Sequence, residues 1–393
     1  MTQKSLMLTL AVLTSLALGA APSEPATETP SPLAGLDLDA MKLDDGAYRQ
    51  RLEDGRTITF TVNAELQRFA DRQLDKYEIP VGSAVILNSR TGRVHALSQQ
   101  VTDEAMAELE QAALDPSPPA ASLFKIVSAA ALLERGEVTP GTRTCYHGGS
   151  GKLLDEHLVD SKKLDTACAS LRAALGRSIN AIFAKLSDRR LDRSTLASYA
   201  ERFGFNRDLP FDVSVPRSTA EIPQDRLERA RTAAGFWHTH LSPLHAAVIA
   251  QAVAQDGAML RPYIVDNVAD SGGEVIYESS PKFVGRAVEK ETADQLLDAM
   301  EHTVTRGTAR TAFHDKRGAP LLPGIAVAGK TGTLTGKKPY RAYSWFVGIA
   351  PADDPEIAMA VLVVNKPKWR IKSAGLSELL LGEYFRLKKL GRI

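Results

Sequence analysis

The chain has 393 residues, of which 44% are hydrophobic and 24% are charged, close to the averages of soluble globular proteins. It is long enough to bury a large core. With 48 basic and 47 acidic residues, the formal net charge of +1 provides no basic field for nucleic acid and no strong attraction to acidic lipid. We therefore expect no nucleic-acid partner.

The first residues have the pattern of an export signal. Lys4 supplies a positive start, residues 6–18 form an apolar run, and small residues follow up to Ala21. We expect a signal peptide at residues 1–21 and a periplasmic or secreted protein. The apolar run is shorter than the roughly 20 residues that a membrane-spanning helix needs. An uncleaved signal that tethers the protein to a membrane is therefore the less favoured alternative.

Export affects how the two cysteines, Cys145 and Cys168, are interpreted, because disulfides persist in oxidising compartments. We expect one disulfide, which would stabilise the fold by about 3 kcal/mol through loop closure. Two free thiols remain the alternative. A metal site with His147 and His157 is less favoured, because the spacing is unlike that of zinc ligands.

Residues 22–32 alternate Pro, Ser, Thr, Glu and Ala and predict a disordered linker. Residues 47–52 and 57–62 flank the turn dipeptide Asp54-Gly55, which predicts a hairpin at the end of this 22–56 segment. The folded domain should begin near Thr57 and extend to residue 393.

Strands from both ends of this domain are expected to form one sheet. Helical spacing of apolar residues predicts a helix over 64–77, and strands are expected at 82–88 and 93–97. A helix from 122 to about 135 is apolar on nearly every side, which is typical of a helix inside a domain. Three late strands, at 325–334, 343–349 and 357–364, precede an amphipathic helix at 373–389.

Between these ends, residues from about 136 to 320 carry helical stripes at 171–186, 196–203 and 244–253. We expect an α+β fold: a five-stranded antiparallel sheet flanked by helices, from about 57–121 and 321–393, plus an all-helical lobe over about 136–320.

Ser122 and Lys125 lie three residues apart at the start of the apolar helix and therefore project from one face. A serine hydroxyl is a poor nucleophile until a base accepts its proton, and a lysine can accept it when burial lowers its pKa. The apolar neighbours of Lys125 supply such surroundings. The pair alone also fits a helix cap beside a solvated lysine.

Two further motifs offer polar groups. In Ser178-Ile179-Asn180, a second hydroxyl could relay a proton to a leaving amine and the Asn180 amide could hold a peptide carbonyl, although the motif alone also fits a helix break. Lys330-Thr331-Gly332-Thr333 lies on a late strand, where its ammonium and hydroxyls suit a carboxylate and Gly332 allows close approach of a ligand backbone. By itself it could be a surface strand.

His238 and His240 alternate as two metal ligands on a strand would. Trp237 and Pro243 nearby fit a structured loop better, so no metal site is expected.

Taken together and in this order, the three motifs resemble the S-x-x-K, S-D-N and K-T-G set of penicillin-binding proteins and serine β-lactamases. From about Thr57 to its end the chain resembles the transpeptidase domain of penicillin-binding proteins, also at residues 59–67, 178–183, 328–333 and 344–351. The segment before Thr57 is too short for a glycosyltransferase domain, so we expect a lone transpeptidase unit.

The resemblance implies a role for each motif residue. Ser122 would be the acylated nucleophile, Lys125 its base, and Ser178 and Asn180 the proton relay and substrate clamp. Lys330, Thr331 and Thr333 would hold the terminal carboxylate of a D-alanyl-D-alanine stem peptide of peptidoglycan. The backbone N–H groups of Ser122 and Thr333 would hold the oxyanion. The chemistry needs no cofactor, and β-lactams would be covalent inhibitors.

Two other functions remain open at this point. Ser122-Leu123-Phe124-Lys125 and Trp345 also resemble class D β-lactamases, but the second motif of those enzymes usually ends in valine, so Asn180 favours the penicillin-binding group. A catalytically silent module that senses muropeptides or β-lactams is the second alternative, and the intact set of Ser122, Lys125, Ser178 and Lys330 argues against it. Cross-linking and trimming of stem peptides are not distinguished by the sequence.

Overall fold

The computed structural model describes residues 31–393 apart from residues 110, 338 and 339. The predicted signal peptide at residues 1–21 and the linker up to residue 30 lie outside the described residues. Within the described part of the chain, no helix is both long and apolar enough to cross a lipid bilayer.

The central sheet has five antiparallel strands in the order β14-β15-β16-β4-β5. These strands are β14 (Ala328–Lys337), β15 (Tyr340–Ala350), β16 (Ile357–Asn365), β4 (Val81–Asn88) and β5 (Val94–Val101). The pairing of β16 with β4 joins the two chain ends in one sheet. The predicted five-stranded antiparallel sheet and the α+β class are confirmed.

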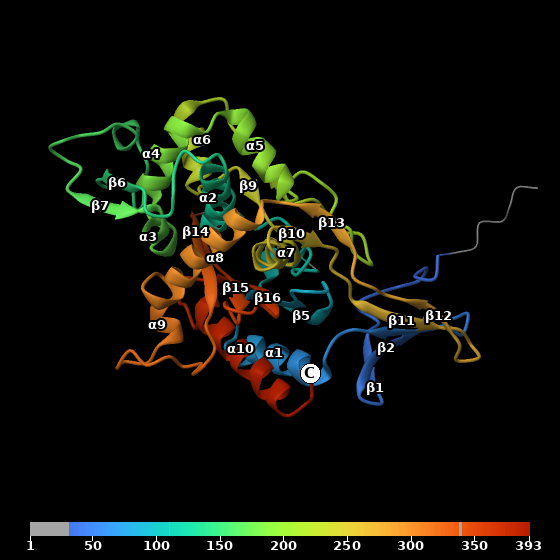
Figure 1. Ribbon diagram of the computed structural model, residues 1–393. Coiled ribbons are helices and arrows are strands. Elements are labelled where there is room, and N and C mark those ends of the chain that lie inside the picture. Colours follow the sequence, from blue (N-terminus) through green and yellow to red (C-terminus); the bar gives the residue numbers. More distant parts are fainter. Residues whose placement is uncertain (1–30, 110, 338–339) are drawn as a thin grey trace, which may run out of the picture.

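Helices cover both faces of this sheet (Figure 1). Helices α1 (Ala64–Lys76) and α10 (Ser373–Lys389) pack on one face, and α7 (Pro243–Ala254) packs on the other. Neighbouring residues of a strand point to opposite faces, so Trp345 belongs to the core beside α7 and Phe346 to the core beside α10. Every residue of α7 is buried, because sheet and helices surround it.

The lobe next to the sheet contains most of the helices (Figure 1). They are α2 (Lys125–Glu134), α3 (Leu171–Gly176), α4 (Asn180–Arg190), α5 (Arg193–Arg202), α6 (Arg226–Ala233) and α8 (Lys290–Thr305), with 3₁₀ turns η1 (Glu104–Met106) and η3 (Asp155–His157) elsewhere in the chain. Helix α9 (Arg310–Phe313) follows α8 and lies beside α10, where Phe313 packs on Phe346.

The expectation that residues 136–320 are all helical is wrong, because this segment also contains several short strands. They are β6 (Arg143–Tyr146), β7 (Ala167–Ser170), β8 (Thr219–Ala220), β9 (Thr239–His240), β10 (Ala258–Leu260), β11 (Val265–Ala269), β12 (Val275–Glu278) and β13 (Phe283–Arg286). β11 and β12 form a hairpin around Gly272-Gly273, a turn that the sequence signals in the same way as the Asp54-Gly55 turn.

A second sheet, in the order β1-β2-β3-β11-β12, extends from the side of the molecule (Figure 1). The predicted hairpin is present as β2 (Ala47–Arg51) and β3 (Thr57–Phe60), and β1 (Lys42–Asp44) precedes it. The disordered linker expected at residues 22–32 lies almost entirely outside the described residues, and residues 31–46, between it and the hairpin, take part in the fold. The Arg56 guanidinium fastens them by donating to the carbonyl oxygens of Pro32 and Ala34.

Candidate active site

Ser122 lies in a 3₁₀ turn, η2 (Ala121–Phe124), directly before α2. The α-helix expected from Ser122 therefore begins at Lys125. Side chains three residues apart are eclipsed in a 3₁₀ turn. As a result the two groups meet, with Lys125 Nζ 2.8 Å from Ser122 Oγ.

Lys125 is fully buried, and its Nζ also contacts Asn180 Oδ1, at 2.7 Å, and the carbonyl oxygen of Ala234. Burial, and secondly the positive charge of Lys330, lower the pKa of Lys125 well below its usual value. A neutral amine has two N–H donors and one lone pair. The two carbonyl oxygens take the donors, so the lone pair is left for the Ser122 hydroxyl proton.

The second motif lies where the predicted helical stripe is interrupted. Helix α3 ends at Gly176, Ser178 has a left-handed φ of 55°, and α4 begins at Asn180. Such a backbone conformation is uncommon for residues other than glycine and is found often at functional sites. The break lets Ser178 line the same cavity as Ser122, and it directs Asn180 Oδ1 at Lys125. Asn180 Nδ2 donates to the carbonyl oxygen of Ser150 at 2.9 Å.

Lys330 on β14 is fully buried and donates to Ser178 Oγ at 3.0 Å and to the carbonyl oxygen of Thr331 at 2.6 Å. Burial lowers the pKa of Lys330 to about 7. The sequence suggested that this ammonium meets a ligand directly. In the structure Lys330 is buried, and its Nζ contacts Ser178 Oγ, which lines the cavity in front of Ser122.

Two adjoining cavities, of about 360 and 420 Å³, lie in front of these groups. Both are lined by Ser122, Asn180 and Thr333, so the cleft passes Ser122 on two sides. Ser178, Thr331 and Gly332 line the first cavity, whereas Ser150 and Trp237 line the second. The structure thus places the residues of all three motifs at or directly behind one cleft.

Two glycines allow backbone to approach Ser122 closely. A Cβ at Gly332 would lie 3.3 Å from the Ala121 Cβ and 3.4 Å from the Ser122 nitrogen. At Gly235, which has a φ of +78°, a Cβ would lie 2.5 Å from the Ala121 carbonyl oxygen. Gly235 is not recognisable as a site residue from the sequence. Its local signal, a glycine after a helix, indicates only a helix end.

The buried Trp345 holds the chain before Ser122 against the sheet. Its indole Nε1 donates to the carbonyl oxygen of Pro119 at 2.9 Å, and its backbone pairs with Gly332 across β14 and β15. The nucleophile turn and the third motif are therefore fixed to one strand pair.

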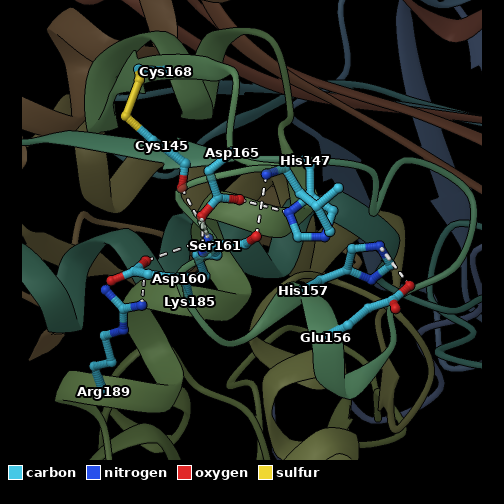
Figure 2. A network of polar contacts seen from close by, with 11 residues as sticks. Cys145, His147, Glu156, His157, Asp160, Ser161, Asp165, Cys168, Lys185 and Arg189 are labelled. Atoms are coloured by element: carbon cyan, nitrogen blue, oxygen red, sulfur yellow. Dashed lines mark hydrogen bonds and ion pairs between the residues drawn. A yellow bond between two sulfur atoms is a disulfide. The ribbon is translucent and has the colours of Figure 1, made fainter.

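A polar network under the loop between β6 and β7 supports the start of α4 (Figure 2). Cys145 and Cys168 form a disulfide between the two strands. The fully buried Lys185 of α4 donates to Asp165 Oδ2 at 2.6 Å and to the Cys145 carbonyl oxygen at 3.1 Å. His147 Nδ1 lies 2.6 Å from Asp165 Oδ1. The loop that supplies Ser150 to the cleft is thus fastened to the helix that begins at Asn180.

The network keeps the Asp165 carboxyl ionised. Burial raises the pKa of this carboxyl, but the hydrogen bonds from His147, Lys185 and the Ser161 backbone outweigh burial and hold the pKa well below its usual range.

The two alternating histidines have partners within the protein. His238 Nε2 lies 3.2 Å from Glu228 Oε2, and His240 Nδ1 lies 2.9 Å from the Ser117 carbonyl oxygen. Across the described residues there is no group of three or more His, Cys, Asp or Glu side chains that could hold a metal ion.

Comparison with known proteins decides the family. The family model of the penicillin binding protein transpeptidase domain matches residues 82–378. The chain belongs to this transpeptidase family. The expected family and fold class are thereby confirmed.

Relatives of this transpeptidase domain are similar along most of its length. Stage V sporulation protein D of Bacillus subtilis is 28% identical in an alignment of 347 positions, which covers 82% of this chain and 52% of that protein. Peptidoglycan D,D-transpeptidase PbpA of Mycolicibacterium smegmatis is 26% identical over 81% of this chain and 71% of its own length. This chain therefore spans about half of the first relative and about seven tenths of the second.

Among solved structures, the D,D-transpeptidase domain of a peptidoglycan glycosyltransferase from Eggerthella lenta has a TM-score of 0.68 and 27% identity. The likeness covers 85% of this chain and 84% of that one. The shared architecture is therefore that of a transpeptidase domain.

Proposed function

We propose that this protein is a penicillin-binding D,D-transpeptidase or D,D-carboxypeptidase. It acts on D-Ala-D-Ala stem peptides of peptidoglycan through a serine acyl-enzyme in cell wall synthesis or remodelling. The observation that carries the proposal is the fully buried Lys125, whose Nζ contacts Ser122 Oγ while two carbonyl oxygens occupy its donors.

In the proposed reaction Lys125 accepts the proton of Ser122, and Oγ attacks the carbonyl carbon of the penultimate D-alanine. The C–N bond breaks, and the leaving amine takes a proton relayed through Ser178. D-alanine departs, and the acyl group passes to an amine or to water. The backbone N–H groups of Ser122 and Thr333 stabilise the oxyanion, a type of contact worth about 3–4 kcal/mol in comparable enzymes.

The remaining motif residues position the peptide. Asn180 uses one Nδ2 hydrogen on Ser150, so the second can donate to a peptide carbonyl of the substrate. The hydroxyls of Thr331 and Thr333 line the first cavity and can donate to the terminal carboxylate, with the field of Lys330 behind them. Gly332 leaves room for the peptide backbone.

Similar proteins support this assignment. Relatives from Mycolicibacterium smegmatis and Mycobacterium tuberculosis carry the name peptidoglycan D,D-transpeptidase. Penicillin-binding protein A from M. tuberculosis, 25% identical with a TM-score of 0.66, has been solved as an imipenem acyl-enzyme complex. For this protein we accordingly propose stem peptides as substrates, β-lactams as covalent inhibitors, and a place of action outside the cytoplasm. The signal peptide at 1–21 is part of this proposal.

The test is covalent labelling of the full chain with a fluorescent penicillin, followed by mass spectrometry of the labelled peptide. We expect one adduct, on Ser122, and none on Ser122→Ala. No adduct on the unchanged protein, or equal labelling of the variant, would contradict the mechanism. Rapid multiple turnover of the penicillin would assign a β-lactamase instead, and equilibrium binding without an adduct would assign a silent sensor.

A second assay separates the two proposed reactions. The protein is incubated with a stem peptide and an amine acceptor, and released D-alanine is compared with cross-linked product. D-alanine without cross-links identifies a carboxypeptidase, and stoichiometric cross-links identify a transpeptidase.

A further inference from the structure

Thr308 lies outside the three motifs and yet lines the first cavity beside Thr331. It belongs to the turn between α8 and α9, and its Oγ1 is 2.5 Å from Thr331 Oγ1. The turn is more than twenty residues before the third motif in sequence, so the contact is made by the fold.

The backbone of this turn is fixed against the segment that leads to the second motif. Thr308 N donates to the carbonyl oxygen of Gly176 at 3.1 Å, and Ala309 N donates to the Thr303 carbonyl oxygen at 3.0 Å. Gly176 ends α3, two residues before Ser178. Thr308 therefore connects the helical lobe to β14 at the cleft.

The direction of the hydroxyl–hydroxyl bond follows from what a carboxylate requires. An ionised carboxylate only accepts hydrogen bonds, so Thr331 must donate its single hydroxyl proton to the ligand. It can do so only if Thr308 is the donor in the pair. The single hydroxyl proton of Thr308 must then point to Thr331 and not to the Gly176 carbonyl oxygen, which lies farther away, 3.4 Å from Thr308 Oγ1. A hydroxyl that accepts such a bond is also held in one rotamer and polarised as a donor.

We propose that Thr308 is a positioning residue that orients the Thr331 hydroxyl toward the carboxylate of the ligand. This inference rests on the proposed function, because it assumes that Thr331 binds that carboxylate. Thr308 acts through Thr331 and takes no part in the acyl transfer itself.

The experiment measures the second-order rate constant for acylation of the full chain by a fluorescent penicillin, which carries a carboxylate. Thr308→Val removes the hydroxyl and keeps the shape. We expect acylation to slow by about threefold to tenfold, the effect of losing one hydrogen bond. Thr308→Ser keeps the hydroxyl and should stay within twofold of the unchanged protein.

A double-mutant cycle tests whether the effect passes through Thr331. In a Thr331→Val background, we expect the further change Thr308→Val to alter the rate by less than twofold. Thr305→Val, at the exposed end of α8 outside the cavity, is the matched control and should leave the rate unchanged. Urea unfolding of each variant checks that the fold is intact.

Three outcomes would overturn the inference: an unchanged rate in Thr308→Val, an equal loss in both backgrounds, or no rescue by serine. Each of these leaves the proposed function standing as long as Ser122 of the unchanged protein is acylated. Absence of labelling on the unchanged protein would instead remove the proposed function, together with the inference that rests on it.

Discussion

Lys125 is completely buried, and its ammonium form would lie close to the positive charge of a second buried lysine, Lys330. Burial and this neighbour both disfavour the protonated form, which is the form that cannot accept a proton. At the residue scale, the proposed reactivity of Ser122 therefore depends on the protonation of one amine.

Replacing Lys125 by arginine tests this dependence, because a guanidinium stays protonated in proteins and cannot act as a base. We expect the rate of penicillin acylation to fall by about a hundredfold to ten-thousandfold, the usual contribution of general base catalysis. The measurement is time-resolved labelling. Lys152→Arg, at an exposed position of the neighbouring loop, serves as the control. An acylation rate within tenfold of the unchanged protein would exclude Lys125 as the base.

Lys330 makes the stability of the fold depend on pH. Its pKa is about 7 in the folded protein and 10.5 for an exposed lysine, so the unfolded chain binds more protons between these values. The free energy of unfolding should therefore rise with pH from about 7 to 10.5, by up to about 1.4 kcal/mol per pH unit for this one group. Lys125, whose pKa is lowered too, adds a slope of the same sign.

Urea unfolding at pH 7, 8 and 9 measures this slope. In Lys330→Met we expect a smaller rise with pH than in the unchanged protein. Equal slopes in the two proteins would show that Lys330 is not the group responsible.

The motif residues were predictable as a set, because the residue types, the spacing and the order of the three motifs are visible in the sequence. The residues that complete the site were not. Ala234 contributes a backbone carbonyl, Gly235 a missing side chain, and Ser150 a second carbonyl, and none of these leaves a chemical signature in sequence. Thr308 lies in an ordinary helix-ending turn, so its meeting with Thr331 became visible only in the fold.

At the scale of elements, helix α4 carries two functional positions: Asn180, the proposed substrate clamp, at its first residue, and the buried Lys185 near its middle. Lys185 donates hydrogen bonds to Asp165 and to Cys145 of the disulfide-linked strand β6. The loop from β6 to β7 is therefore fastened to the helix. The geometry at Asn180 therefore relies on contacts made one and a half turns further along the helix.

Lys185→Met should be strongly destabilising, because it leaves the nearly buried Asp165 carboxylate without its cationic partner. Loss of one partner of a buried ion pair typically costs about 3–5 kcal/mol in the free energy of unfolding. Urea denaturation measures the loss, with Lys163→Met at an exposed site of the same loop as control. The double variant Lys185→Met, Asp165→Asn should be less destabilised than the single one. A loss below about 1 kcal/mol in the single variant would contradict this description.

The sequence predicted elements well where one face of a strand or helix repeats its apolar residues. The central sheet, α1 and α10 follow such patterns. Prediction failed for β10 to β13, because these strands are short and because their partners are not all local: β10 pairs with β13 across the β11–β12 hairpin. β11 is an example: it pairs with β3, about two hundred residues earlier, and Val265 and Val268 alone do not reveal this pairing.

At the scale of the whole molecule, the cleft exists because sheet and lobe meet along one strand. β14 brings the third motif, the turn before α2 brings the first, and the break before α4 brings the second. The order of the motifs along the chain indicated a family, and the arrangement of sheet and lobe shows why three distant segments are needed: each supplies a different wall of the cleft.

Strand β14 is also the last strand of the central sheet, with β15 on one side and the cleft on the other. An extended peptide that lies along this free border can extend the sheet by main-chain hydrogen bonds. Main-chain hydrogen bonds of this kind depend on the backbone conformation of the peptide more than on its side chains. If the proposed stem peptides bind in this way, peptides that differ in their middle residues are accepted alike, whereas the end that enters beside Thr331 is strictly selected.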